Sequence, residues 1–119
     1  YVLHLIRLRR IRARFRRIRA RERLTAELDG TLADQTLVSR RFGLGAVALV
    51  EGAMNPAEVL RAMVASAGPD APSFARYALE KGYLSEARLR ELVETRKEGR
   101  FLADQVRLAR RKVEELETG

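Results

Sequence analysis

The sequence lacks the residues on which several kinds of site depend. It has no cysteine, so it can form neither a disulfide nor a thiolate metal site. His4 is the only histidine, which excludes a metal site with several histidines. Aromatic residues are also scarce: four Phe, three Tyr and no Trp. We therefore expect no metal and no other cofactor, and we expect that the protein is not an enzyme.

Long apolar runs are missing as well. A helical membrane span needs about 20 apolar residues, and Tyr1 to Ile6 are too few for a span or a signal-peptide core. Because Arg7 follows this short run abruptly, the segment is typical of the inner end of a span that continues as a basic juxtamembrane helix. The chain starts without Met, so we expect a processed or trimmed product.

The residues that are abundant favour helices. Ala, Leu, Arg and Glu dominate the composition, and all four are good helix formers, whereas runs of strand-favouring residues are scarce. The sequence predicts an all-α protein. A long basic amphipathic helix over residues 1–29 would lead into a compact bundle of short helices over residues 30–119.

The net charge of +8 is concentrated on the first helix. Residues Arg7 to Leu24 include ten arginines and one acid, Glu22, while the other residues hold fourteen Lys or Arg against fifteen Asp or Glu. The body is thus close to neutral. A high isoelectric point here describes one basic helix rather than a basic domain.

The first helix carries a near-repeat of seven residues, LRRIRAR at 8–14 and FRRIRAR at 15–21. The spacing places an apolar stripe on one face, which ends before Glu22 and Thr25. A parallel dimer along this stripe would bring flanking arginines together, so we expect an anionic partner instead. The stripe residues are Leu8, Ile11, Phe15 and Ile18, and Arg12, Arg14, Arg19 and Arg21 flank them. The candidate anion-binding residues are Arg7, Arg9, Arg10, Arg14, Arg16, Arg17 and Arg21.

The identity of that partner stays open between an anionic membrane surface, an acidic protein, nucleic acid, and no specific partner. Arginine suits phosphate and carboxylate equally well, so the residue type does not decide. The leading interpretation is a non-catalytic docking or signalling adaptor, or an assembly subunit, in the cytoplasm at the inner face of the inner membrane. The alternative is a protein that binds nucleic acid phosphates through the same arginines, with little base readout. The oligomeric state is left open.

The body contains further start and stop signals for helices. Gly30 is expected to end the first helix, and residues 31–41 are expected to form a short helix. A last helix is expected over residues 100–116. The side chains expected to face inward on these two helices are Leu32, Leu37, Val38, Phe101, Leu102, Val106 and Val113.

Residues 44–66 and 74–96 align at an offset of thirty, which predicts two helix–turn–helix units. The alignment matches Gly52 with Gly82 and the capping residue Asn55 with Ser85.

This repeat resembles a known module. The segments GLGAVALVEGAMNPAEVLRAM and FARYALEKGYLSEARLRELV resemble the N-terminal helical domain of type II secretion and type IV pilus assembly ATPases, over residues 42–98. The resemblance implies a bacterial helical scaffold that docks to partner proteins, here without an ATPase domain. Some copies in that family bind cyclic di-GMP through Arg-Leu-Gly at the start of the unit and Gln at its end. Here Gly43-Leu44-Gly45 and Ser66 stand in those places, so we do not expect that activity.

Two other patterns are interpreted as structural. The match to G-x-G-x-x-A over residues 43–48 has neither a preceding buried strand nor a suitably placed acid, so we expect its glycines to permit close packing. The carboxylate pairs Glu91/Glu94 and Glu114/Glu117 are expected to be solvated and to pair with nearby basic residues such as Arg88, Arg90 or Arg110.

Overall fold

The computed structural model describes the backbone of residues 2–29 and 36–118, and the side chains of residues 11–29 and 36–116. Within these ranges the chain forms six helices and one small antiparallel sheet, so the predicted all-α class is confirmed. The elements are α1 (Val2–Leu28), β1 (Leu37–Ser39), α2 (Leu44–Val50), α3 (Pro56–Ala65), α4 (Phe74–Glu80), α5 (Glu86–Glu98), β2 (Arg100–Leu102) and α6 (Ala103–Thr118).

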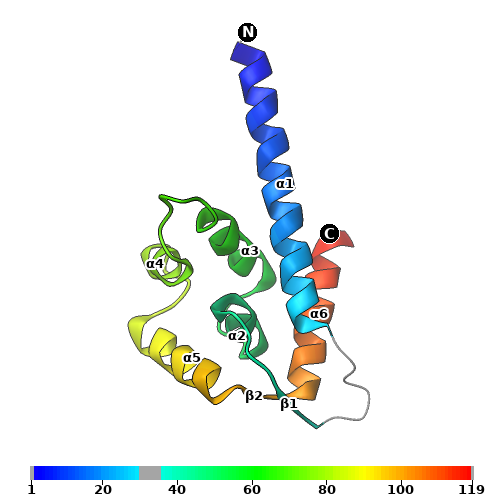
Figure 1. The fold of residues 1–119 in the computed structure, drawn as a ribbon, viewed down its shortest axis with the longest axis vertical. Helices are drawn as coiled ribbons and strands as arrows, with labels where there is room; N and C mark the ends of the chain where they lie inside the picture. The colour runs from blue at the N-terminus through cyan, green and yellow to red at the C-terminus, as the bar shows by residue number, and fades with distance from the viewer. Residues whose placement is uncertain (1, 30–35, 119) are drawn as a thin grey trace.

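Helix α1 gives the molecule its elongated shape. Its second half packs beside α6 and the body, and its first half extends beyond every other helix (Figure 1). The longest axis measures 55 Å against 31 and 24 Å for the other two. The Cα radius of gyration is 15.5 Å, whereas a compact chain of this length would have about 13.5 Å.

The body is built from two helix–turn–helix units of the same design, α2–α3 and α4–α5. Each turn contains a glycine in the left-handed region, Gly52 at φ 72° and Gly82 at φ 74°. Each glycine N–H donates to the carbonyl three residues earlier, at 3.1 Å in both units. The following helices are capped by Asn55 and Ser85, whose side chains accept from the backbone N–H three residues later. The left-handed glycine and the cap are what let the chain reverse direction without leaving backbone groups unpaired.

One hydrophobic core joins α1 to both units and to α6. Aliphatic side chains from each of these parts are at most 2 % exposed. Gly45 allows α2 to approach closely, because a Cβ there would lie 3.2 Å from Val59 and 3.3 Å from Phe74. The expectation that this glycine serves packing is therefore confirmed. The central buried side chains are Leu24, Leu28, Val47, Leu60, Leu92, Val106 and Val113.

The helix predicted over residues 31–41 is wrong where the structure describes it. Residues Leu37–Ser39 form β1, which pairs with β2 so that Val38 lies opposite Phe101. Only one face of this strand meets the core, so Val38 is buried while Leu37, predicted to face inward, is 57 % exposed. Gly30 and Leu32 lie outside the described residues.

The last helix starts three residues later than predicted. Gly99 adopts φ 66° and ends α5, and residues 100–102 then form β2 before α6 begins. The strand alternation turns Leu102 outward, at 47 % exposure, which contradicts its predicted inward position. The predicted burial of Phe101, Val106 and Val113 is confirmed.

Candidate functional site

The second half of α1 is held by the body. Ala20, Leu24 and Leu28 follow one another at intervals of four residues, so they share one face of the helix, and all three are buried. At its end, the Arg40 guanidinium donates to the backbone carbonyls of Glu27 and Asp29. Carbonyls at a helix C-terminus lack helical partners and favour a cation, so this contact stabilises the anchored end.

The apolar stripe lies on a different face of α1 and is uncovered. Ile11, Phe15 and Ile18 are 49, 61 and 49 % exposed. These side chains are at least as large as those of the buried face, which uses Ala20, Leu24 and Leu28 instead. Leu8, the fourth predicted stripe residue, has a side chain outside the described residues. The stripe is therefore available to a partner along its described length.

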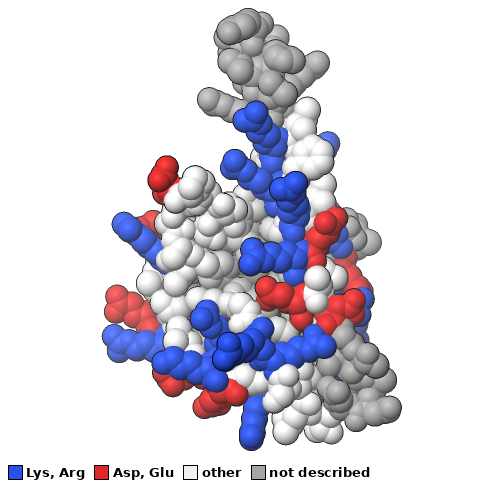
Figure 2. Space-filling model, viewed as in Figure 1, with Lys and Arg blue, Asp and Glu red and all other residues white. Residues whose placement is uncertain are grey.

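The arginines of α1 divide into two groups by helix face. Arg12, Arg16, Arg19 and Arg23 are spaced by four, three and four residues, which places them in one row between the stripe and the buried face. No ion pair links any of these four to a carboxylate in the described residues. Figure 2 shows basic side chains running down the described part of α1 beside an uncharged surface over α3 and α4. We refer to these four residues as the arginine row.

The other group lies closer to α3 and α6. Arg14, Arg17 and Arg21 line a hollow with Ile18, Leu60 and Leu116. Arg21 is only partly exposed and its Nε is buried, so it belongs to the packed side of the helix. The side chains of Arg7, Arg9, Arg10 and His4 lie outside the described residues.

The structure places the predicted anion-binding residues that it describes on two sides of α1. Of the proposed set, Arg16 is in the row, whereas Arg14, Arg17 and Arg21 line the hollow instead. Arg12, Arg19 and Arg23 complete the row but were not in that set. Together with Arg16 these residues stand at positions i, i+4, i+7 and i+11, which lie on one face of a helix. This spacing is the sequence signal that could have identified them as a row.

A groove runs along the last three arginines of the row. It has a volume of about 570 Å³ and lies between the row, the start of α2 and the end of α3. Arg16, Arg19 and Arg23 form one wall, and Leu24, Met63 and Phe74 contribute apolar lining. Glu27 closes one end, where its carboxylate accepts from the N–H of Gly43 at 3.2 Å.

Three arginines outside α1 make contacts within the fold. Arg40 holds the end of α1, and Arg110 on α6 forms an ion pair with Asp29 at 2.9 Å. A hydrogen bond to Tyr83 is the main reason that the pKa of Arg61 is raised above its ordinary value. These contacts use the cations internally and add nothing to the arginine row.

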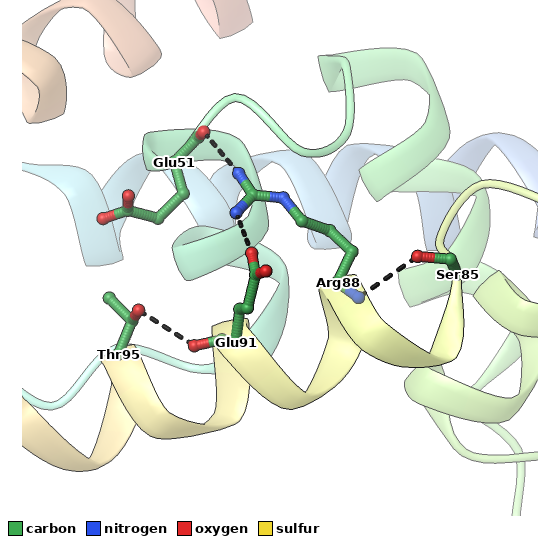
Figure 3. Close-up of polar contacts among 5 residues, drawn as sticks. All are labelled: Glu51, Ser85, Arg88, Glu91 and Thr95. Carbon is green, nitrogen blue, oxygen red and sulfur yellow. Dashed lines mark hydrogen bonds and ion pairs between the residues drawn. The ribbon is translucent and has the colours of Figure 1, made fainter.

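The acidic pairs are also structural. The Arg88 guanidinium donates to the Glu91 carboxylate at 2.7 Å and to the backbone carbonyl of Glu51 at 3.1 Å, which ties α5 to the end of α2 (Figure 3). Ser85 caps the same helix, and the Thr95 hydroxyl donates to the carbonyl of Glu91 (Figure 3). Paired, solvent-exposed carboxylates of this kind do not have the dry environment that acid–base chemistry needs.

The remaining carboxylates follow the same pattern. Glu94 pairs with Lys97 and Glu114 with Arg110, which confirms the expectation that nearby basic residues neutralise them. The side chain of Glu117 lies outside the described residues. No group of three potential metal ligands occurs among the side chains that the structure describes.

Comparison of the chain with protein-family models, curated proteins and solved structures finds no match. The site must therefore be interpreted from its own residues. None of the helices in the described ranges is long and apolar enough to cross a membrane. The features that distinguish the molecule are the uncovered stripe, the arginine row beside it and the groove on the far side of that row.

Proposed function

We propose that the protein is a non-catalytic docking adaptor that binds an anionic membrane surface through the projecting half of α1. The observation that carries the proposal is the exposure of Ile11, Phe15 and Ile18 along one face of a helix whose first half extends away from the body. A soluble helix gains nothing from presenting three large apolar side chains to water. Full burial of an exposed side chain of this size contributes roughly 1.5–3 kcal/mol. Because each of these three side chains is about half exposed, its burial in a lipid interface would contribute roughly half of that.

Charge on both sides of the stripe supports a lipid interface. Arg12 and Arg19 lie along one edge, and Arg14 lies along the other. An interfacial helix has this arrangement, with its apolar face among the acyl chains and its basic edges among anionic headgroups. In a bacterium such a surface is the cytoplasmic face of the inner membrane, where positively charged juxtamembrane segments gather. The two helix–turn–helix units would then stand on the cytoplasmic side as the adaptor body.

Nucleic acid is the competing partner for the same arginines. Phosphate contacts need cations alone, and stacking on bases needs aromatic side chains, of which the described part of α1 has only Phe15. Neither mode makes use of Ile11 and Ile18. The apolar stripe therefore favours lipid over a polyphosphate chain.

The test is co-sedimentation with phosphatidylcholine vesicles that do or do not contain phosphatidylglycerol. The variant Ile11→Ser/Phe15→Ser/Ile18→Ser removes the stripe and keeps the charge. The matched control Leu37→Ser/Leu102→Ser/Leu108→Ser removes three equally exposed side chains from the body. We expect the protein to bind only the anionic vesicles, the stripe variant to bind at least about tenfold more weakly, and the control to bind normally.

A parallel gel shift with double-stranded DNA and RNA at two salt concentrations decides the alternative. Binding to nucleic acid that weakens steeply with salt, with no vesicle binding, would reject the membrane proposal. Equal vesicle binding by the stripe variant and the wild-type chain would reject it as well.

A further inference from the structure

We infer that the groove beside α1 receives an acidic amphipathic helix of a partner protein. The site is separate from the apolar stripe, because the arginine row lies between them. The inference goes beyond the proposed membrane contact and does not depend on it. Three steps lead to it: unneutralised charge, matching periodicity and an apolar lining.

The first step is the charge on the groove wall. Arg16, Arg19 and Arg23 face the groove and form no ion pair with a carboxylate in the described part of the chain. Like charges at i, i+3 and i+4 repel one another and weaken the helix that carries them. The repulsion between these arginines falls when an external anion lies along the row.

The second step is the geometry of the row. Four arginines at i, i+4, i+7 and i+11 run parallel to the helix axis over about 17 Å at 1.5 Å per residue. The last three of them line the groove, and Arg12 continues the row about one turn beyond it. A second α-helix laid alongside presents its own side chains with the same period of 3.6 residues. Acidic residues with the same spacing on that helix would meet the arginines one by one. A small anion could occupy only part of this length.

The third step is the lining opposite the row. Leu24, Met63, Val64 and Phe74 give the groove a largely apolar surface next to the cationic wall. A helix with an apolar face beside an acidic face matches both surfaces at once, which is the usual helix-in-groove arrangement. Nucleic acid would place phosphates or bases on this apolar lining, and the groove supplies one aromatic ring, Phe74, for stacking.

Glu27 sets the end of the complementary pattern. Its carboxylate lies at the end of the groove beyond Arg23 and is held there by the N–H of Gly43. An acidic residue of the partner at this level would be repelled. The partner helix should therefore carry its acids opposite the row and a neutral or basic residue opposite Glu27.

The test uses a synthetic amphipathic peptide of about 18 residues, long enough for roughly five helical turns. Glu occupies the i, i+4, i+7 and i+11 positions, and Leu occupies the adjacent face. A permuted peptide of identical composition, with Glu spread around the helix, is the control. Fluorescence anisotropy with the full chain measures both affinities. We expect the patterned peptide to bind at least about tenfold more tightly, and more weakly as salt rises.

Two variants locate the binding. Ala67 lines the groove and is exposed, so Ala67→Trp fills the groove without entering the core; Ala87→Trp on exposed α5 is its control. We expect the Ala67→Trp variant to bind the peptide about tenfold more weakly and the Ala87→Trp variant to bind it as the wild-type chain does. Arg16→Glu/Arg23→Glu should abolish binding, whereas Arg90→Glu/Arg111→Glu makes the same change of charge on the exposed body and should leave it intact.

The outcomes separate this inference from the membrane proposal. The Ile11→Ser/Phe15→Ser/Ile18→Ser variant should lose vesicles and keep the peptide, while Ala67→Trp should lose the peptide and keep vesicles. Equal affinity for the patterned and permuted peptides would overturn the inference. Unchanged peptide binding by the Ala67→Trp variant would overturn it too. So would a competition experiment in which a single-stranded oligonucleotide displaces the labelled peptide at a lower concentration than the unlabelled peptide does.

Discussion

The two halves of α1 have opposite surroundings. The second half buries Ala20, Leu24 and Leu28 in the core, while the first half leaves Ile11 and Phe15 in solvent. Both halves are rich in arginine, so charge does not separate them. The apolar side chains on the exposed half are as large as any on the buried half. Hydrophobicity alone therefore does not decide what the body covers, and the uncovered stripe is a surface that the fold does not need for its own stability.

The largest change in the free energy of unfolding is expected for a substitution in the buried half of α1. Leu24 is 1 % exposed, so Leu24→Ala would leave a cavity and lower the free energy of unfolding by about 3 kcal/mol. Urea denaturation followed by circular dichroism measures the change. Leu108→Ala, on the exposed surface of α6, is the control and should shift the value by less than about 0.5 kcal/mol. Similar losses for the two variants would show that α1 does not contribute to the core.

An intermediate effect is expected where the anchored half ends. Arg40→Ala removes the cation that binds the carbonyls of Glu27 and Asp29, so we expect a loss of about 1 kcal/mol. Amide hydrogen exchange should accelerate in the last turn of α1 and stay unchanged over residues 11–18. The neighbouring exposed Arg41→Ala should have no such effect. Unchanged exchange in that last turn would contradict the role given to Arg40.

The smallest effect on stability is expected at the exposed half. Phe15→Ser should change the free energy of unfolding by less than about 0.5 kcal/mol, because the ring is 61 % exposed and does not belong to the hydrophobic core. The same denaturation experiment measures it, with Leu24→Ala as the positive control. A loss above about 1 kcal/mol would show that the stripe supports the fold and is not held ready for a partner.

The sequence predicted the units of the body well because their signals are local. A left-handed glycine and a capping Asn or Ser act through hydrogen bonds within a few residues, and these hydrogen bonds are present in both turns. The short sheet escaped prediction because β1 and β2 are three residues long and lie far apart in the chain. Their pairing depends on the tertiary contact between Val38 and Phe101, which no local pattern records.

The site was predictable in part for the same reason. The seven-residue repeat revealed the stripe directly, and its described members are exposed. The repeat did not reveal which arginines face the groove, since that depends on where the body packs against α1. The burial of Ala20 and Leu24 shows which face of α1 packs against the body. In the sequence these two residues are less conspicuous than the seven-residue repeat beside them. Once this face is known, the arginine row follows from helical geometry alone.

The continuity of α1 links the two proposed contacts mechanically. The helix runs unbroken from Val2 to Leu28, about 40 Å at 1.5 Å per residue, and its far end is clamped by the core. Because the helix is continuous, a tilt or rotation of its first turns is transmitted to its last turns. Whatever holds the tip therefore also sets the direction in which the groove opens, so attachment at one end would determine the angle of approach available to a partner at the other.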